Sequence, residues 1–583
     1  MKAVFRLTAS STRALPRSAM FALCIIYAAT GLFGRDPWKN EDAAGFGVMW
    51  TMAHGHLVDW ILPNLVGKPM PEYGPLGYWL SALSIRAFEP LLGAPDAARL
   101  ATAALFLSAC ALLWYGTYLL GRRAEVQPFK YAFGGEPLPR DYGRTIADGA
   151  VLILLACFGL AERGHETTPQ LAQFACVAMV LYGIVRGLDK PVQGALWWGA
   201  AIGLLTLSAN PVLAIATLIF NVVSMALLLR GRLALRPMFG IGLPIAALVA
   251  LSWPLLALRL GGAAAAASYL HDWAAGNFDN FGGPDVHALA YAVKNLPLYT
   301  WPAWPLAIWS WWSWGGLRRA PHVVAPLAVA APLIITIVLQ NEQTNRLFVL
   351  LLPPLAMLAA FSLPTLKRGA VNAIDWFALL SFTILGGFVW LVWLAGLTGF
   401  PYPIARNLSR LVPGFQASFN PLTFAAAIVA TGCWMVLVRW RLARHPVVLW
   451  RSVVLSSAGT TLMWILLMTL WLPVINYSRT YRDVALQISA HLPNGYRCVT
   501  PVRLGDAQIA SFAYFAKLRF TFAGTDCDVL LRQDTQDFVP PGSDTSDAWR
   551  LVWQGRRAAD RDENFAMYVR RTPRAASAAP EQH

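Results

Sequence analysis

The sequence is poor in charged residues. Only 13% of its 583 residues are charged, and 31 of them are Asp or Glu, whereas a soluble globular domain carries roughly 25% charged residues. Apolar residues make up 57% of the chain, and the mean hydropathy is +0.48. This composition excludes a soluble globular protein and predicts an all-α polytopic membrane protein. Because cytoplasmic loops of membrane proteins collect Lys and Arg, we assign the net charge of +16 to such loops and expect no nucleic-acid partner.

Ionisable residues are almost absent from the interiors of the long apolar runs. Ion-coupled transporters and channels usually keep Asp, Glu, Lys or Arg at mid-membrane depth, and the sequence shows no clear inverted repeat. The sequence therefore argues against a transporter, and it places any chemistry on one face of the membrane.

Cysteine is scarce, and five of the seven cysteines lie inside apolar runs, where Cys behaves as a small hydrophobic residue. Cys498 and Cys527 lie in the polar C-terminal part. If that part is outside the cytoplasm, the two can form one disulfide.

Thirteen apolar runs are candidates for membrane-spanning helices, each of which needs about 20 apolar residues. Basic residues precede the first run, but no small-residue cleavage site follows it, so we expect an uncleaved span. The runs lie near 19–34, 97–120, 147–162, 169–186, 195–209, 211–229, 238–258, 296–316, 323–341, 346–364, 372–398, 418–438 and 452–474.

The distribution of basic residues predicts the orientation. With the N-terminus inside, the inside loops hold more Lys and Arg than the longer outside segments, as the positive-inside rule requires. The C-terminus is then outside. An odd number of crossings, with the two termini on opposite sides, requires that the short apolar segment 75–88 does not cross. We expect it to lie in the outer interface, which suits its Tyr78 and Trp79. The first outer loop then runs from 35 to 96.

The last part of the chain, residues 476–572, reads as a small α/β domain after a membrane domain of residues 1–475. Helical patterns at 479–492 and 505–518 alternate with short β-like runs. Residues 573–583 are rich in Ala and Pro, and we expect them to be disordered.

Carboxylates gather in the predicted outer segments. The stretch 34-GRDPWKNEDAAGFG-47 follows the first run directly, and other polar excursions on the same side lie at 60–80, 162–169 and 259–295. Such charges are often plain solvated loop residues. Here several excursions on one face predict that they converge above the helices.

Two segments in this region resemble a known family. A carboxylate pair and a helix are followed by 63-PNLVG-67 and then 72-EYGPLGYW-79. This order resembles the first outer loop of the aminoarabinose transferase family and its relatives in glycosyltransferase family 39, and 346-RLFVLLLPPLAML-358 resembles a basic turn before a Leu/Pro-rich span of the same family. The chain departs from the family pattern at Glu41-Asp42, where the order is usually Asp-Glu, and at Tyr73 and Gly74, where Lys and Pro are usual.

The resemblance implies a GT-C fold and an inverting transfer in the bacterial inner membrane, with a polyprenyl-phosphate-linked sugar as donor. It implies a lipid A or other envelope glycolipid acceptor, with an aminoarabinose-like sugar or a hexose as the transferred group. A protein hydroxyl as acceptor, in the manner of protein mannosyltransferases, is the first alternative. A transporter of lipid-linked sugars and an inactive scaffold homologue are alternatives of another class.

The candidate site residues follow from the resemblance and from their place on the outer face. Asp42 or Glu41 is the predicted general base, and the sequence does not separate them. The predicted substrate-binding residues are Glu72, Tyr73, Lys68, Arg346, Glu166 and Arg259. Among these, Arg346, Lys68 and Arg259 are candidates for contact with the lipid phosphate, and Glu166 for the acceptor side.

A divalent metal is a further expectation from the resemblance. Glu72 and His271 are its candidate ligands. One Glu and one His are too few ligands by themselves, so a hydrogen-bonded structural His271 is the competing interpretation.

Overall fold

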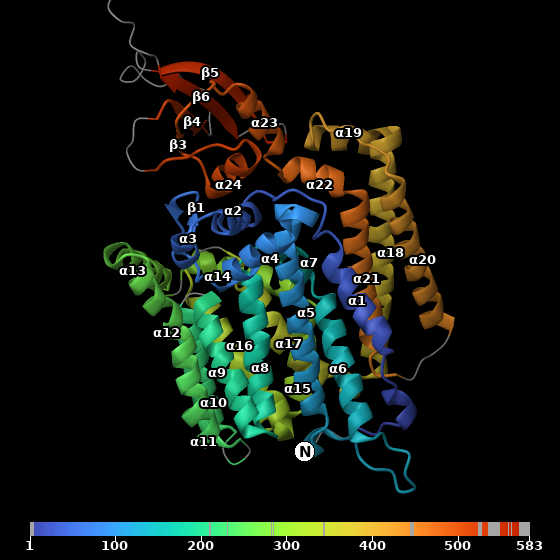
Figure 1. Ribbon diagram of the computed structural model, residues 1–583. Helices are drawn as coiled ribbons and strands as arrows, with labels where there is room; N and C mark the ends of the chain where they lie inside the picture. The colour runs from blue at the N-terminus through green and yellow to red at the C-terminus, as the bar shows by residue number, and fades with distance from the viewer. Residues whose placement is uncertain are drawn as a thin grey trace, which may run out of the picture.

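The computed structural model of the chain is a helical bundle with a small sheet domain on one face (Figure 1). We call the face that carries the sheet domain the upper face and the opposite one the lower face. The structure describes residues 5–570 apart from 209–210, 230, 232, 282, 284, 342–343, 444–447, 523–526, 535–548, 558 and 561–562. The predicted disordered tail, 573–583, lies outside the described residues.

Within the described residues, seven helices are long and apolar enough to cross a membrane, and each falls on a predicted run. They are α5 (Ala94–Gly121), α8 (Gln170–Gly187), α12 with the turns before it (Leu235–Leu260), α16 (Pro321–Leu339), α18 (Arg368–Thr398), α20 (Pro421–Ala443) and α21 (Arg451–Leu470).

The other predicted runs form shorter or more polar helices. They are α1 (Arg17–Ala29), α6 (Pro139–Ala156), α9 (Pro191–Ser208) and α10 (Pro211–Leu227). Two runs are broken. The run 296–316 contains the end of α14 (Val286–Tyr299) and then α15 (Ala303–Ser313), with Pro302 between them. A helix of 11 residues is about 16 Å long, which is short of the roughly 30 Å hydrocarbon core.

The run 346–364 forms a 3-10 turn (Phe348–Leu351) followed by α17 (Leu352–Ala360). Pro353 and Pro354 lie in the first turn of α17, where the missing N–H of proline costs no helical hydrogen bond. Thirteen crossings therefore remain a prediction, whereas the polytopic helical fold is confirmed.

The predicted first outer loop contains several short elements that lie toward the upper face (Figure 1). It contains α2 (Glu41–His54), α3 (Leu57–Ile61), the paired strands β1 (Asn64–Leu65) and β2 (Lys68–Pro69), and α4 (Leu76–Leu92). Helix α4 covers the segment 75–88 and lies beside α2 on the upper side of the bundle (Figure 1).

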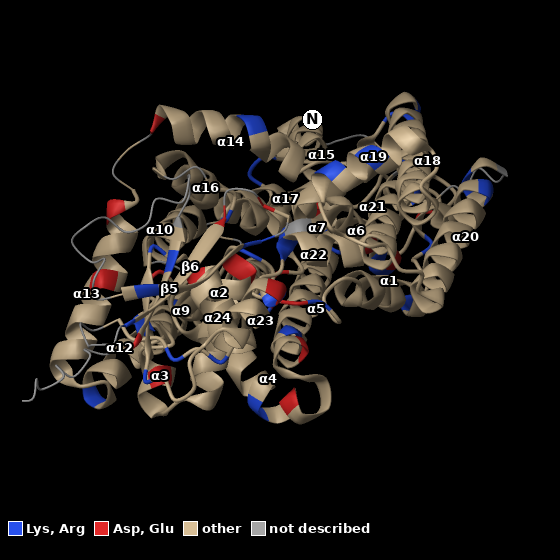
Figure 2. Cartoon of the chain, turned by 90° about the horizontal axis from the view of Figure 1, so that it is seen from above, with Lys and Arg blue, Asp and Glu red and all other residues tan. Residues whose placement is uncertain are grey.

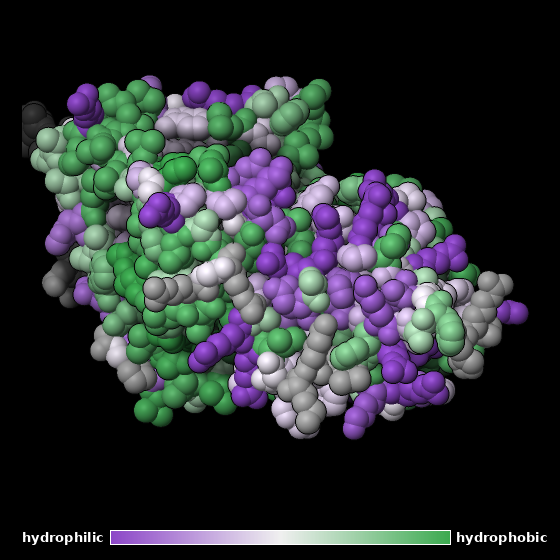
Figure 3. Space-filling model, turned by 90° about the horizontal axis from the view of Figure 1, so that it is seen from below, coloured by the Kyte–Doolittle hydropathy of each residue, from purple (hydrophilic) through white to green (hydrophobic). Residues whose placement is uncertain are grey.

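Three more helices lie near the upper face. These are α7 (Phe158–Arg163), α13 (Ala263–Asp279) and α19 (Tyr402–Leu411). The loop between α5 and α6 and the short helix α11 (Leu235–Pro237) lie at the lower face with the N-terminus (Figure 1). Seen from below, hydrophilic residues gather over part of that face beside a broad hydrophobic area (Figure 3).

The C-terminal part is an α/β domain, as predicted. After α22 (Leu472–Arg479) it contains α23 (Arg482–Ala490), α24 (Asp506–Phe515) and a sheet in the order β3-β4-β6-β5. Strand β3 pairs with β4 in parallel, and the other pairs are antiparallel. The disulfide between Cys498 and Cys527 is present, which confirms that prediction. The strands are β3 (Val499–Val502), β4 (Val529–Asp534), β5 (Trp549–Arg556) and β6 (Asn564–Arg570).

The C-terminal domain is docked tightly on the first outer loop. Helix α24 packs on α2, where a Cβ added to Gly47 would lie 2.5 Å from Cβ of Ala510, so only glycine permits this approach. Beside this contact, the buried carboxylate of Asp36 accepts hydrogen bonds from Arg482 and from the hydroxyl of Thr480, the latter at 2.9 Å. The domain is therefore held over α2 by both apolar packing and ionic contacts.

Candidate active site

A cavity of about 480 Å³ lies between α2 and the C-terminal domain. Seen from above, acidic and basic residues lie side by side around α2 (Figure 2). Each carboxylate that lines the cavity has a cationic partner, so its charge is balanced locally. The pairs are Glu41 with Arg163 and Arg346, Glu72 with Arg346, Asp506 with Lys68, and Glu563 with Arg557.

Glu41 and Asp42 occupy the first turn of α2, where the helix dipole favours carboxylates, and they point to different places. Glu41 lines the cavity. Its Oε1 accepts a hydrogen bond of 2.7 Å from Nε of Arg346, and its Oε2 accepts one of 2.8 Å from Nη1 of Arg163. The Glu41 side chain is 24% exposed, so it is reachable from the cavity.

Asp42 faces the protein interior, where its side chain is 2% exposed, and it does not line the cavity. Its carboxylate accepts hydrogen bonds from Arg35 at 2.7 Å and from the backbone N–H groups of Trp38 and Thr167 at 2.9 and 2.6 Å. Burial by itself raises the pKa of Asp42, but Arg35 and Arg99 reverse this and lower it to about 2. Asp42 is thus charged at neutral pH and joins α2 to the loop before α8.

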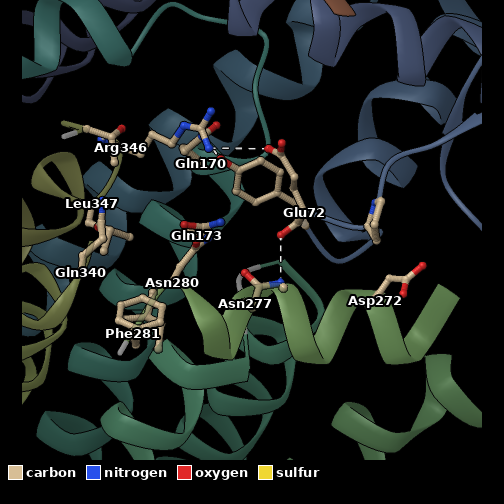
Figure 4. Close-up of a pocket in the computed structure, with 15 residues that line it drawn as sticks. Glu72, Gln170, Gln173, Asp272, Asn277, Asn280, Phe281, Gln340, Arg346 and Leu347 are labelled. Atoms are coloured by element: carbon tan, nitrogen blue, oxygen red, sulfur yellow. Dashed lines mark hydrogen bonds and ion pairs between the residues drawn. The ribbon is translucent and has the colours of Figure 1, made fainter. Parts of the chain in front are cut away.

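Two arginines hold Glu41 from separate parts of the chain. Arg163, at the end of α7, also donates to Glu166 at 2.8 Å and to Asn345. Arg346 also contacts Glu72 at 3.5 Å, and Figure 4 shows its guanidinium reaching toward this carboxylate. Although burial lowers the pKa of Arg346, Tyr73 and the carboxylates of Glu41 and Glu72 raise it overall, so the guanidinium stays charged.

A second, smaller cavity of about 190 Å³ adjoins the first. Glu72, Tyr73, Gln170 and Arg346 line both cavities and separate them. Nε2 of Gln170 donates to the hydroxyl of Tyr73 at 2.8 Å, while its Oε1 is buried without a hydrogen-bond partner. A buried amide oxygen of this kind favours a donor group supplied by a ligand. On the far side, Asn277 of α13 donates to the backbone oxygen of Glu72 at 3.3 Å (Figure 4).

Tyr73 and Gly74, where the family usually has Lys and Pro, both lie against other parts of the chain. Tyr73 lies in the wall between the cavities, with its ring 5.9 Å from Cζ of Arg346. A Cβ added to Gly74 would lie 2.1 Å from the backbone oxygen of Leu207, so proline does not fit in this backbone position.

The structure brings together some of the predicted site residues and leaves others outside. Glu41, Glu72, Tyr73 and Arg346 line the larger cavity. Glu166 lies behind it and positions Arg163. Lys68 pairs with Asp506 of the C-terminal domain, and Arg259 is exposed at the end of α12; neither lines the two cavities.

Sequence reasoning missed Arg163 and the contribution of the C-terminal domain. Arg163 lies within the polar segment 162–169, and its basic charge among carboxylates was the available signal. Tyr481, Gln508 and Glu563 line the larger cavity from the C-terminal domain. No pattern in the sequence marks these three, because only the docking of the domain turns them toward α2.

The predicted metal ligands do not form a complete site. His271 is exposed on α13 and lines neither cavity, whereas Glu72 lines both. Among the residues that the structure describes, no group of three or more His, Cys, Asp or Glu side chains is placed to hold a metal ion. Among the described residues, Glu72 and His271 therefore do not form a complete ligand set for a divalent metal.

Comparison with known proteins identifies the fold. No family model and no curated protein sequence match the chain. Among solved structures, ArnT from Cupriavidus metallidurans in the apo state matches with a TM-score of 0.64 at 15% identity, over 94% of this chain and 97% of that one. The chain has the fold of ArnT, a GT-C fold. The same enzyme bound to undecaprenyl phosphate matches with a TM-score of 0.63 at 14% identity, over 97% of this chain and 99% of that one.

The ArnT match covers both the bundle and the C-terminal domain, so it confirms the GT-C fold that the resemblance implied. At this level of identity the likeness concerns the fold, and function has to be argued from the site.

Proposed function

We propose that the protein is an inverting glycosyltransferase that moves a sugar from a polyprenyl-phosphate carrier to a hydroxyl of lipid A or another envelope glycolipid. The observation that carries the proposal is Glu41, a carboxylate held between Arg163 and Arg346 in a cavity at the upper face of a GT-C fold. That ArnT of the same fold binds undecaprenyl phosphate supports a lipid phosphate as the donor's carrier.

The proposed location is the bacterial inner membrane, with the upper face and the C-terminal domain in the periplasm. The basic residues Arg122, Arg140 and Arg144 lie around the α5–α6 loop at the lower face, which the positive-inside rule assigns to the cytoplasm. The disulfide between Cys498 and Cys527 agrees with an oxidising compartment for the upper face.

Glu41 is the proposed general base. It takes the proton of the acceptor hydroxyl, whose oxygen forms a bond to the anomeric carbon while the bond from that carbon to the phosphate oxygen breaks. Attack opposite the leaving group inverts the anomeric centre. Asp42 is the weaker candidate because its oxygens are occupied by Arg35 and two backbone donors away from the cavity.

The two arginines that hold Glu41 are the proposed phosphate ligands: Arg346 lines both cavities, and Arg163 lines neither but contacts Glu41 directly. Guanidinium groups bind phosphate oxygens through paired, charge-assisted hydrogen bonds. A phosphate that binds Arg163 and Arg346 in place of Glu41 releases the carboxylate of Glu41. That carboxylate then has free lone pairs for the acceptor proton. Arg346 and Arg163 thereby supply the cations that the family's usual Lys would supply at Tyr73.

The C-terminal domain is the proposed acceptor-selecting element. Tyr481, Gln508 and Glu563 face Glu41 across the larger cavity, and hydroxyl, amide and carboxylate groups suit hydrogen bonding to the polar head of a glycolipid. A protein hydroxyl as acceptor is the alternative within the same enzyme class, and the experiment below includes it.

The test is turnover of undecaprenyl-phosphate-linked sugars by the purified protein in nanodiscs, with envelope glycolipid or a Ser/Thr-containing peptide as acceptor. Release of the lipid phosphate is measured for the wild type, Glu41→Gln and Asp42→Asn. We expect release with the glycolipid, and loss of release in Glu41→Gln, although that variant remains folded and still binds undecaprenyl phosphate.

Other outcomes change the proposal in defined ways. Release with the peptide alone would make the protein a protein glycosyltransferase. Release that survives in Glu41→Gln but not in folded Asp42→Asn would move the base to Asp42. No release with any donor by folded protein would favour an inactive scaffold, and movement of the lipid-linked sugar across the bilayer without transfer would favour a transporter.

A further inference from the structure

A third cavity, larger than the two above, is remote from the candidate active site. It has a volume of about 610 Å³ and lies between α1, α5 and α6. The lining of the cavity changes from basic to apolar along the helices. Arg17 begins α1, and Arg140 and Arg144 lie in the first two turns of α6, which starts at the lower face (Figure 1). The residues further along the helices are apolar, among them Phe21, Ile25, Leu107, Ala111 and Val151.

The length of the cavity matches one leaflet of a bilayer. On α5 its lining runs from Tyr118 near the lower end to Leu107, which is a rise of about 16 Å. This is roughly half of the 30 Å hydrocarbon thickness. Phe21, Ile25 and Tyr115 are 67%, 53% and 56% exposed at its rim, so the cavity opens toward the surrounding lipid.

The basic end of the cavity has more basic than acidic groups: three arginines line it, and two carboxylates, Asp141 in the first turn of α6 and Asp148, lie near them. Within the described part of the chain, Arg17 and Arg140 form no ion pair, and both are exposed. Asp148 is buried, and both of its carboxylate oxygens accept hydrogen bonds. Its Oδ2 accepts from the N–H of Leu15 at 2.9 Å, and its Oδ1 accepts from Nε1 of Trp114 at 2.8 Å.

We infer that this cavity is a binding site for an anionic glycerophospholipid of the leaflet next to the lower face. The headgroup phosphate contacts Arg17, Arg140 and Arg144, and one acyl chain fills the apolar part between α1 and α5. Basic pockets between membrane helices on the cytoplasmic side suit anionic headgroups, and the apolar remainder excludes a soluble phosphate as the natural occupant. This inference does not depend on the proposed glycosyltransferase activity.

The lipid has a structural consequence for α1. That helix runs from Arg17 to Ala29, and about half of its residues are exposed. A chain between α1 and α5 adds apolar contact to a helix that has few neighbours. The site therefore predicts that an anionic lipid stabilises the folded protein.

The experiment measures thermal unfolding of delipidated full-length protein in detergent, with added phosphatidylglycerol, phosphatidylcholine or inorganic phosphate. The test variant is Arg17→Gln/Arg140→Gln/Arg144→Gln. The matched control, Arg319→Gln/Lys367→Gln/Arg368→Gln, removes the same charge from exposed positions elsewhere near the lower face. Ala111→Trp blocks the acyl-chain part and leaves all charges in place.

We expect phosphatidylglycerol to raise Tm in the wild type and in the control, with little effect of the other two additives. Each basic residue contributes roughly fivefold to binding of an anionic lipid, so the triple variant should bind on the order of 100-fold more weakly. Ala111→Trp should also lose the shift. An equal shift in the wild type and the triple variant, or an equal shift from phosphatidylcholine, would overturn the inference.

Discussion

Arg346 lies 305 positions after Glu41 in the chain, and its Nε donates a hydrogen bond of 2.7 Å to Oε1 of Glu41. This contact joins the turn before α17 to the first turn of α2. Glu41 is the proposed general base, and Arg346 is a proposed phosphate ligand. In this structure the two are hydrogen-bonded to each other. In the proposed mechanism, a phosphate therefore has to compete with Glu41 for the arginine before the carboxylate can accept a proton.

Exchange of the two neighbouring carboxylates for amides should give opposite results. Glu41→Gln should lower turnover by at least about 100-fold, the usual contribution of a general base, with little change in unfolding temperature. Asp42→Asn should lower the free energy of unfolding by about 3–5 kcal/mol, because the buried Arg35 loses its carboxylate partner, whereas Arg99 keeps its ion pair with Asp96. Turnover and thermal unfolding of both variants, measured together, check this. A destabilised Glu41→Gln with normal turnover would contradict it.

Acid should weaken the fold through Asp42. Its pKa is lowered from 3.8 to about 2 in the folded protein, so its contribution to stability is present above about pH 5 and is lost as the pH falls through about 4 to about 2. The shift corresponds to about 2 kcal/mol. The difference in unfolding free energy between the wild type and Asp42→Asn should therefore shrink from pH 7 to pH 2.5. A difference that does not depend on pH would mean that the pKa of Asp42 is the same in the folded and unfolded protein.

Removal of either arginine beside Glu41 should weaken lipid-phosphate binding. Arg346→Ala and Arg163→Ala should each raise the Kd for undecaprenyl phosphate by about 10-fold to 100-fold, the value of one or two charge-assisted hydrogen bonds. Arg259→Ala is the control, since Arg259 is exposed and lines neither cavity. Calorimetric titration in detergent measures all three. Equal binding by Arg346→Ala and Arg259→Ala would remove Arg346 from the proposed site.

Gly74 should not accept a side chain. A Cβ at this position meets the backbone oxygen of Leu207 at 2.1 Å, so Gly74→Ala should destabilise the protein by about 1–3 kcal/mol through overpacking. Gly369→Ala, at a position with nothing within 4 Å, should have no such effect. The thermal unfolding temperatures of the two variants and the wild type test this, and equal temperatures for Gly74→Ala and the wild type would contradict it.

The disulfide should stabilise the C-terminal domain. Cys498 and Cys527 are 29 positions apart, and closure of a loop of this length contributes roughly 3 kcal/mol. Cys498→Ser should lower the unfolding temperature, whereas Cys433→Ser, at an exposed free cysteine, should not. Free thiols at both positions in protein purified without reductant would contradict the disulfide itself.

The order of elements could be predicted from the sequence because it depends on local patterns. Long apolar runs predict spanning helices from the cost of exposing polar backbone to lipid, and within the described residues seven of them form helices long and apolar enough to cross a membrane. Helical and strand-like patterns that alternate after residue 476 predict the α/β domain, because periodicity is also read within short segments. The runs at 296–316 and 346–364 contain short helices beside prolines, and the mean hydropathy of a run does not record such breaks.

The composition of the site was decided by the tertiary structure. The sequence by itself determined that the protein is a polytopic membrane protein with carboxylates at one face, and that Glu41 or Asp42 is the leading candidate. It did not separate the two, because adjacent residues at the start of a helix point about 100° apart and only the packing around α2 shows which direction is the cavity. Arg163 and the C-terminal residues reach Glu41 only through contacts between distant segments, which no local pattern records.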